Sequence, residues 1–573
     1  MEQRNLLIAI VISVVILIGF QFVYERFAPP PAPTHHPTTS APAAPPPSAA
    51  APRVPSTATA PAKPETRAAA LASEPQIAIG TPRLHGSIDL QGARFDNLTL
   101  ADYHVSVSPK SPEVVLLRPS GTKNAYLARF GWAAGVSGVK VPGPDTVWQA
   151  ATQEPLTPTH PVVLTWDNAA GLRFTKTISV DRNYMFTIRD SVRNTGKTPV
   201  TLTPYGLISR SGKLAGSSTW YVHVGLAGYL AGHVFGTSGW FSDPDSYAKL
   251  LPGEPRNYTS TGGWLGFTDK YWLTSLIPPQ HEKIEARFAH NKAGSTSRYE
   301  ARFEGPAVTL APAATTASST RFFAGAKELN LLRAYTAAGI PKFDLAIDFG
   351  KFYFLTEPIF LTLQLFKHAI GNFGVAILLF TFMVKLMFFP LANKSYKAMS
   401  RMRLLQPEVQ KLRERFPDDK ARQQQEMMAL YKRVGANPLS GCLPIVIQLP
   451  VFYALYKVLY VTLEMRHAPF FGWIHDLSAP DPTSFVNLFG LLPFAPPHLL
   501  MIGAWPIIMG VTMFLQQKLN PQPVDPMQAR MFLILPVVFT WMLAAFPVGL
   551  VIYWAWNNLL SVAQQWAIYR SSA

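Results

Sequence analysis

The sequence contains few of the residues that carry out covalent, redox or metal chemistry. Its single cysteine, Cys442, excludes a disulfide within the chain and lies in an apolar segment, as is typical of a small packing residue. We find no glycine-rich phosphate loop, no Gly-x-Ser-x-Gly, no His-Glu-x-x-His and no paired-cysteine motif. We therefore expect a protein that is not an enzyme, with no catalytic residue, no cofactor and no metal ion.

Charged residues are also scarce, at 15% of the 573 residues against 48% hydrophobic residues. This composition is too apolar for one soluble domain and too polar for a membrane bundle alone. The apolar residues are concentrated towards the two ends, which indicates a mixed protein. The formal net charge of +17 would fit a nucleic-acid binder, but it also fits a membrane protein with basic cytosolic loops. We expect the lipid bilayer as a partner and no specific nucleic acid.

The N-terminal segment 1–27 contains an apolar run at 6–24 that is long enough to cross a bilayer. A cleaved signal peptide is the competing interpretation, but Glu25 and Arg26 follow the run where a small-residue cleavage site would be expected. We favour an uncleaved anchor. Residues 28–75 contain 14 prolines, so we expect an extended Pro/Ala-rich linker there.

Residues 76–340 consist of short alternating runs, such as LRFTKTISV and YMFTIRDSV, separated by turn residues. This pattern predicts a large all-β sandwich domain. The domain's polar residues could form a sugar- or peptide-binding surface. We favour a scaffold whose polar residues cover its solvated faces.

The C-terminal part alternates between apolar and basic segments. Residues 351–369 are amphipathic and predict an interfacial helix, with a span broken at Pro358 as the alternative. With the N-terminal anchor, the predicted fold has six spans, a five-helix core and a cytosolic αα-hairpin. The core segments are spans at 371–391, 438–461, 499–518, 531–546 and 549–567, the hairpin at 392–436 and a loop at 463–498, of which 484–498 should lie along the membrane.

The loop charges predict the orientation. Residues 392–436 contain 11 Lys and Arg against 5 Asp and Glu, whereas residues 463–498 contain one basic residue against three acidic ones. The basic loop should therefore be cytosolic. With six spans, both termini are then cytosolic and the β domain lies outside.

Polar residues inside the spans recur on single helical faces. Their spacing of four residues, or their isolation in an apolar run, predicts a substrate groove. The candidate groove residues are Thr381, Lys385, Gln448, Thr512, Gln516, Tyr553 and Asn557, and the last face continues to Ser561 and Gln565.

The depth of these residues distinguishes a groove from a pore. Lys385 lies ~9 Å from the cytosolic end of its span and Gln448 ~15 Å from its own, at ~1.5 Å per residue. The polar residues thus fall mostly in the cytosolic half, whereas a pore would be polar along its whole length. We expect a wet groove open to the cytosol. A snorkelling Lys385 and interhelical hydrogen bonds at Gln448 and Asn557 remain alternatives.

Several blocks, in order, resemble the YidC membrane protein insertases of Gram-negative bacteria, within the wider YidC/Oxa/Alb family. They are MRLLQPEVQKLRERF, QEMMALYK, NPLSGCLPIVIQLPVFYALY, WIHDLSAPDP, MGVTMFLQQK and FPVGLVIYWAWNNLLSVAQQ. The resemblance covers nearly the whole chain. It implies a periplasmic β-supersandwich and an inner-membrane insertase and chaperone that acts on nascent membrane proteins, alone or with the Sec translocon.

The resemblance also implies that Lys385 is the charged residue of the groove, at a position that is usually arginine. Lysine keeps the charge but lacks the planar fork that could hold a carboxylate through two bonds. After Gln565 only Arg570 is basic, so the hairpin is a better candidate than the tail for contact with the ribosome. We expect a monomer.

Two rival functions make different predictions. A transporter should show inverted repeats and a midplane site, and we see no internal repeat. A membrane-anchored carbohydrate-binding or sugar-modifying protein would carry its function in residues 76–340 and would lose it when they are deleted. An insertase should largely survive that deletion.

Overall fold

The computed structural model describes residues 66–572 except 109, 137, 213–222, 236–241, 244–249, 251, 294–295, 351, 418, 435–442, 493–496, 498–499 and 520–525. The predicted anchor at 6–24, most of the linker and the start of the span predicted at 438–461 lie outside these residues. The linker prediction reached residue 75, but a short helix, α2 (Arg67–Ala72), precedes the first strand. Its alanine-rich run favours a helix, and the Thr66 hydroxyl accepts a hydrogen bond from the Ala69 N–H.

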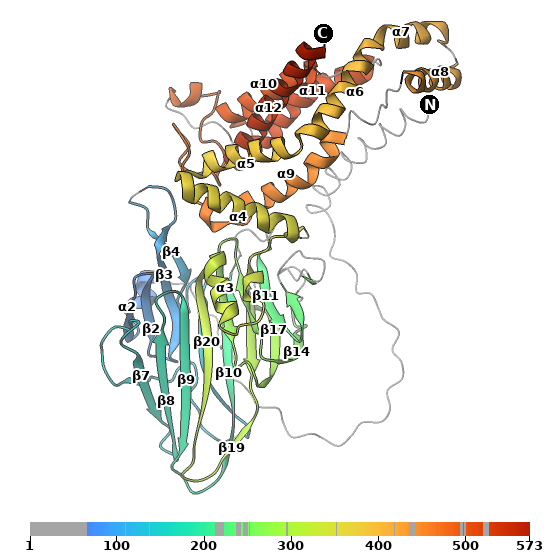
Figure 1. The fold of residues 1–573 in the computed structure, drawn as a ribbon. Coiled ribbons are helices and arrows are strands. Elements are labelled where there is room, and N and C mark those ends of the chain that lie inside the picture. The colour runs from blue at the N-terminus through green and yellow to red at the C-terminus, as the bar shows by residue number, and fades with distance from the viewer. Residues whose placement is uncertain are drawn as a thin grey trace, which may run out of the picture. The chain divides into compact units, whose positions relative to one another are not determined.

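The first β-sheet contains most of the N-terminal strands (Figure 1). Its order is β1 (Gln76–Gly80), β2 (Leu84–Asp89), β3 (Arg94–His104), β5 (Tyr126–Ala134), β10 (Val200–Ser211), β18 (Thr296–Glu304), β17 (Lys283–Ala293) and β14 (Arg256–Thr261), with β4 (Glu113–Leu117) beside β3 and β19 (Val308–Leu310) beside β10.

The second β-sheet contains the remaining strands. Its order is β13 (Ser242–Asp243), β12 (His233–Phe235), β11 (Gly225–Leu230), β15 (Trp264–Thr268), β16 (Trp272–Ile277), β20 (Thr315–Ala326), β9 (Met185–Asn194), β8 (Leu172–Val180), β7 (Val162–Asp167) and β6 (Gln149–Ala150). Most neighbouring strands are antiparallel, as the alternating sequence predicts. In β8 the alternation is clear, because every second residue from Leu172 to Val180 is buried.

Aromatic rings join the two sheets into a sandwich. Phe95 of β3 lies 5.2 Å from Phe186 of β9, and Phe130 of β5 lies 5.6 Å from Phe322 of β20, centroid to centroid. All four side chains are buried. Edge contacts of this kind add to the burial of apolar area, so this cluster forms the centre of the β domain.

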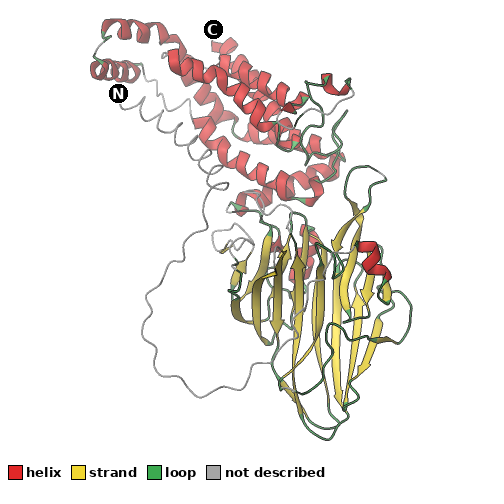
Figure 2. Ribbon diagram, turned by 180° about the vertical axis from the view of Figure 1, so that it is seen from behind, coloured by secondary structure: helices red, strands yellow, loops and turns green. Residues whose placement is uncertain are grey.

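The part of the described chain that follows β20 consists of helices and the loops that join them (Figure 2). The helices are α3 (Leu329–Ala337), η2 (Phe343–Ala346), α4 (Tyr353–Ile370), α5 (Phe373–Met387), α6 (Phe389–Leu404), α7 (Gln406–Arg415), α8 (Lys420–Arg433), α9 (Leu443–Val461), η4 (Leu463–Met465), η5 (Leu488–Gly490), α10 (Ala504–Leu519), α11 (Pro526–Leu543) and α12 (Val548–Ser572).

Proline explains where these helices differ from the predicted segments. The span predicted at 371–391 ends at Met387, and the chain bends by 67° into α6. Pro390 causes this break because it cannot donate a helical hydrogen bond and its ring crowds the preceding turn. Pro407 similarly divides the first helix of the predicted hairpin into α6 and α7. By contrast α4 continues through Pro358, so no break occurs there.

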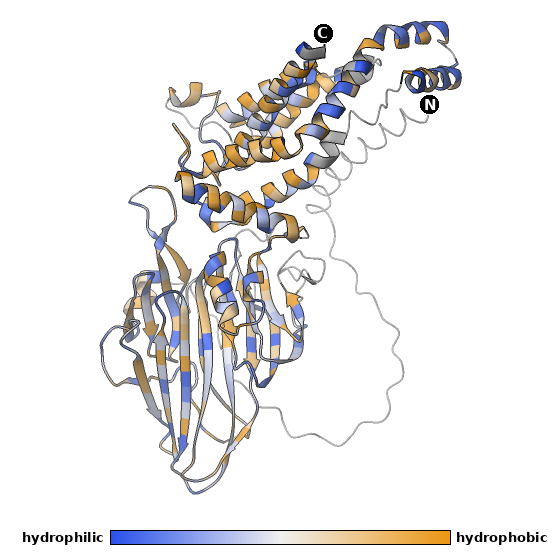
Figure 3. Cartoon of the chain, in the orientation of Figure 1, coloured by the Kyte–Doolittle hydropathy of each residue, from blue (hydrophilic) through white to orange (hydrophobic). Residues whose placement is uncertain are grey.

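We compared the described helices with the length and the apolar composition that a helix needs to cross a bilayer. No single one passes both criteria for crossing a bilayer, whereas α5 and residues Phe389–Met399 of α6 pass them together as a bent pair. Hydropathy nevertheless differs strongly along the helical part. The helices α7 and α8 are largely hydrophilic, and α5 and α9 are largely apolar (Figure 3).

The helices α4, α5, α9, α10, α11 and α12 pack on one another. Gly510 of α10 permits a close approach to α11, because a Cβ there would lie 2.1 Å from the Thr540 hydroxyl. At the end of α9, Lys457 Nζ lies 2.8 Å from Asp348 Oδ2, and both side chains are buried. This ion pair ties α9 to the segment that follows the β domain.

Candidate functional site

Lys385 lies in the last turn of α5 and reaches across to α12. Its Nζ donates a 2.7 Å hydrogen bond to Ser561 Oγ, and the Ser561 hydroxyl donates to the Asn557 carbonyl at 2.8 Å. Ser561 is buried, and Lys385 is half-buried. No carboxylate pairs with Lys385 among the described residues. An ammonium has three donors, so this cation retains capacity for water or for an acidic ligand.

A small hollow adjoins the Lys385 side chain. It is lined by Val384, Lys385, Phe388, Leu391, Ala392, Tyr396 and Gln448. It offers about 40 Å³ to the centres of water molecules. That volume can hold a few waters but no peptide segment, since one water centre needs roughly 10–15 Å³. The hollow therefore has room for water beside the ammonium group and is too small for a substrate segment in this conformation.

A second hydrogen bond links α9 to α12 beside the hollow. The side-chain amide of Gln448 donates to the hydroxyl of Tyr553, whose side chain is buried. Gln448 also lines the hollow. Three helices therefore contribute to one site, with α5 giving the cation, α9 an amide, and α12 the hydroxyls of Ser561 and Tyr553.

The first turns of α6 close this site at one side. Asn393 Oδ1 accepts a 2.9 Å hydrogen bond from Gln564 Nε2 of α12, and the Tyr396 hydroxyl interacts with Ser561 and Gln565. The bend after α5 directs these α6 residues onto α12. Widening the hollow would require these contacts to separate.

The predicted groove residues divide into two groups in the structure. Lys385 and Gln448 line the same hollow, and Tyr553 bonds Gln448. Among the described contacts, Asn557 meets this group only through its backbone carbonyl, which accepts from Ser561 within α12. Thr512, Gln516 and Thr381 are not hydrogen-bonded to that group among the described side chains. Thr381 is buried, and its hydroxyl donates to the Ile377 carbonyl within its own helix at 2.6 Å.

Thr512 has a polar partner that the sequence did not single out. Asn558 Nδ2 donates to Thr512 Oγ1 at 3.4 Å, and the Thr512 hydroxyl donates to the Met509 carbonyl. Asn558 is buried on a different face of α12 from its neighbour Asn557. Two adjacent asparagines in an apolar helix were the available signal, because successive residues lie on different helical faces.

Two family models cover most of the chain. One, described as 60Kd inner membrane protein, matches residues 365–573, and one described as YidC periplasmic domain matches residues 76–362. The membrane protein insertase YidC of Granulibacter bethesdensis is 49% identical over 577 residues, covering 100% of this chain and 98% of that protein. The chain belongs to the YidC family of membrane protein insertases.

Other YidC proteins extend this comparison. The membrane protein insertase YidC of Bradyrhizobium diazoefficiens is 47% identical over 602 residues, covering 99% of this chain and 96% of that protein. A crystal structure of an active YidC insertase with its first transmembrane domain resolved shares 18% identity, covers 86% of this chain and 92% of its own, and has a TM-score of 0.36.

Membership of this family indicates where the two parts of the chain are located. The protein belongs to the inner membrane, and the large β-sheet part is its periplasmic domain, followed by the helical C-terminal region. The YidC periplasmic match extends to residue 362 and so includes the first half of α4.

Proposed function

We propose that the chain inserts nascent membrane proteins into the inner membrane and assists their folding, without covalent chemistry. Family membership supports this function. The observation that carries the mechanism is Lys385, a cation inside an apolar bundle whose partner is the neutral Ser561 hydroxyl. The buried Lys457 of α9, by contrast, has the acidic partner Asp348.

The proposed topology has six spans with both termini in the cytosol. The spans are the anchor at 6–24 and the helices α5, α9, α10, α11 and α12, and α4 lies along the membrane surface. Exposed apolar side chains support lipid contact, among them Leu386 of α5 and Val537 of α11. The α6–α8 segment lies on the cytosolic side, as its basic charge indicates.

The groove lowers the barrier that a hydrophilic segment meets in the bilayer. Once the α6 contacts with α12 separate, water and polar side chains can solvate that segment in the cytosolic half of the membrane. Lys385 attracts acidic segments, because opposite charges interact more strongly at low dielectric. The apolar substrate helix leaves sideways along α9 and α11 into lipid, and its burial drives the step at roughly 25 cal/mol per Å².

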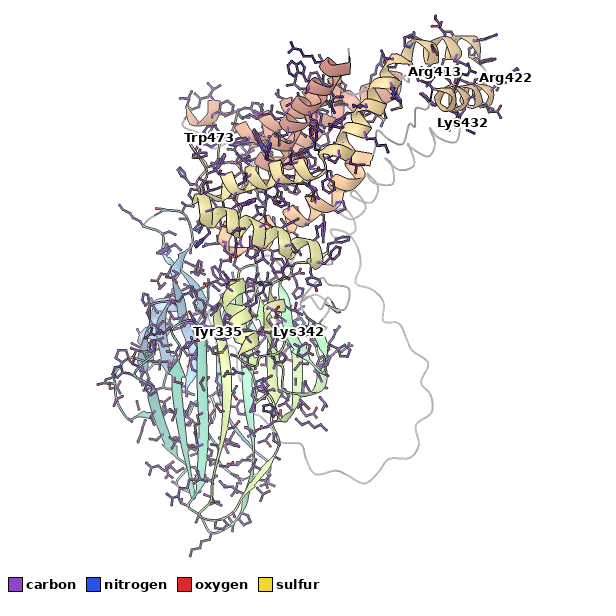
Figure 4. All side chains as sticks on the ribbon, in the orientation of Figure 1. Tyr335, Lys342, Arg413, Arg422, Lys432 and Trp473 are labelled. Carbon is purple, nitrogen blue, oxygen red and sulfur yellow. The ribbon has the colours of Figure 1, made fainter. Side chains whose placement is uncertain are left out.

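We propose the Sec translocon as a partner for some substrates and the ribosome as a partner of the basic hairpin. The proposed functional unit is a monomer in the lipid bilayer. Arg422 and Lys432 of α8 are exposed and could meet ribosomal phosphates (Figure 4).

A reconstituted system tests the function. The purified full chain is placed in vesicles that contain no translocon, and a substrate with one apolar helix and a short hydrophilic tail is synthesised beside them. Protease protection of the tail should appear with the chain and be nearly absent in protein-free vesicles. Equal protection in both would contradict the proposal.

Cysteine labelling tests the groove. In a Cys442→Ser background, Gln516→Cys and Asn557→Cys should react with a membrane-impermeant maleimide supplied from the cytosolic side. Asn557 is buried as well, so its labelling requires the α6 contacts with α12 to separate. Ile377→Cys is the control, because Ile377 is fully buried near the start of α5, about two turns from Lys385. Equal labelling of the groove positions from the periplasmic side would indicate a channel and contradict the groove.

A further inference from the structure

The loop between η4 and α10 presents apolar side chains outward at two places. One is the turn at 470–474, where Phe471 is 62% exposed and Trp473 is exposed as well (Figure 4). The other surrounds η5, where Leu491 reaches 83% exposure. The exposed apolar residues of this second place are Phe485, Leu488, Phe489, Leu491 and Leu492. We refer to 470–473 and 485–492 together as the apolar loop surface.

This surface lies in a sequence without charge. No Lys, Arg, Asp or Glu occurs between Asp481 and Lys518, a stretch that contains the second part of the surface and most of α10. The exposed apolar face of α10, with Val511 and Leu515, continues the same stretch. A loop in water normally carries charged residues, so this one is unusual for a solvated segment.

The backbone around η5 satisfies its own hydrogen bonds, as a segment in lipid must. Four backbone N–H groups donate to carbonyl oxygens within the loop, at 2.7–3.3 Å. The pairs are Leu488 N–H to Phe485 O, Phe489 N–H to Ser484 O, Leu491 N–H to Leu488 O and Leu492 N–H to Asn487 O. This hydrogen-bonded backbone directs the apolar side chains outward and requires an unfavourable conformation at two residues. Leu488 and Phe489 both adopt positive φ, at 51° and 58°, which side chains other than glycine rarely do.

Contacts with the starts of α5 and α10 hold the apolar loop surface beside those helix ends. The Phe470 ring lies 6.0 Å from Trp505 at the start of α10, and it occupies the space that a Cβ on Gly374, at the start of α5, would need. Trp473 Nε1 donates to Asp481 Oδ1 at 3.2 Å, which leaves its ring exposed and its polar atom satisfied. Tryptophan with that division is typical of a membrane interface.

We propose that the apolar loop surface inserts into the acyl chains of the periplasmic leaflet and anchors the outer ends of α5 and α10 there. This inference rests on the orientation proposed above. A loop inserted into one leaflet displaces lipid beside the bundle, on the side opposite the Lys385 hollow.

Depth-dependent quenching tests this proposal on the full chain. In the Cys442→Ser background, Leu491→Cys is labelled with an environment-sensitive fluorophore and the protein is reconstituted in vesicles of phosphatidylethanolamine and phosphatidylglycerol. Quenching by lipids brominated on the acyl chains is compared with quenching by aqueous iodide. Leu488→Cys provides a second position if the first variant does not fold.

Two matched positions serve as references. Val537→Cys lies on α11 and should be quenched by the brominated lipid, whereas Val136→Cys is an exposed apolar residue of the β domain and should be quenched by iodide. The proposal predicts that Leu491→Cys behaves like Val537→Cys, with lipid quenching several-fold above that at Val136→Cys.

The outcomes separate this inference from the proposed function. If Leu491→Cys follows iodide while Val537→Cys follows lipid, the bundle lies in the membrane but the loop does not, and the inference is overturned. Shielding of Leu491→Cys from both quenchers would show protein on the surface and would also overturn it. If Val537→Cys itself follows iodide, the proposed topology fails.

Discussion

Three lysines among the described residues are fully buried or nearly so, and two of them have a carboxylate as their ion-pair partner. Lys176 Nζ donates to Asp190, which lies directly opposite on the neighbouring strand, and Lys457 pairs with Asp348. The third, Lys327 directly after β20, donates to the Thr268 hydroxyl. Lys385 also bonds a hydroxyl, but it is half-buried and lies among the apolar helices. Charge left without a counter-charge in an apolar bundle is expensive, so such a residue is a candidate for function rather than for stability.

A buried acidic cluster in the β domain should make its stability depend on pH. Asp89, Asp96 and Glu74 surround the single guanidinium of Arg94. Burial, together with hydrogen bonding to Glu74, raises the pKa of Asp89 from 3.8 to about 8, and burial raises the pKa of Asp96 to about 6. At Asp89 and Asp96 the folded state therefore binds protons more tightly than the unfolded chain does. The pKa of Glu74 is lowered, because its burial is outweighed by its hydrogen bonds to Asp89 and Arg94 and by the charge of Arg94.

The free energy of unfolding should accordingly decrease as pH rises from about 4 to about 8. Asp89→Asn cannot titrate and should flatten much of this slope, whereas Asp102→Asn, at a more exposed aspartate bound to Arg83, should not. Thermal unfolding of the purified full chain between pH 5 and 8.5 measures both. An unchanged slope in Asp89→Asn would show that the cluster does not titrate in this range.

At the scale of elements, periodicity predicted the class of each long segment but not where it ends. The alternation of LRFTKTISV predicted a strand, and β8 covers that run. Helix ends depended on single residues instead. Pro390 and Pro407 divide helices that periodicity reads as continuous, whereas Pro358 does not divide α4. Whether a proline breaks or only interrupts a helix depends on neighbouring packing, which the sequence does not display.

The ion pair between Lys457 and Asp348 joins two elements, and breaking it should be costly. Lys457→Met leaves the Asp348 carboxylate buried without its cation, which should destabilise the protein by about 3–5 kcal/mol. Adding Asp348→Asn should recover part of that loss, because the unpaired carboxylate is removed, whereas the buried Lys327 loses the nearby charge of Asp348. Lys518→Met is the control, since Lys518 is exposed at the end of α10. Denaturant unfolding in detergent measures all three, and a double variant no better than Lys457→Met would contradict the pair's role.

The basic hairpin should be separable from the bundle. Residues Lys397–Gly441 belong to a compact unit other than that of the bundle, and the described part buries little apolar surface. Replacing 398–434 by a Gly/Ser linker should leave the β domain and the bundle folded but reduce insertion by ribosome-bound substrates. Arg422→Glu with Lys432→Glu keeps the helices and should reduce insertion as well. Loss of the folded bundle in the deletion variant would count against this view.

For the whole molecule, the sequence predicted which helices carry polar faces but not which residues meet. Helical spacing and depth identified Lys385, Gln448 and Tyr553, which lie together around one hollow. Nothing in the spacing predicted that Ser561 would be the partner of Lys385 or that Asn558 would bond Thr512, because helix rotation and register depend on packing. The extended open groove was also a sequence expectation, and the hollow holds only a few waters.

The central claim is that the charge of Lys385 attracts the translocated segment. The most direct measurement is insertion, into membranes that carry each Lys385 variant, of two substrates that differ only in whether the translocated tail is acidic or neutral. Lys385→Arg should be tolerated, and Lys385→Ala should be intermediate. Lys385→Glu should reduce insertion of the acidic tail on the order of tenfold or more relative to the neutral one, because the sign of a contribution worth several kcal/mol at ~4 Å is reversed. Equal insertion of both substrates by Lys385→Glu membranes would contradict the account.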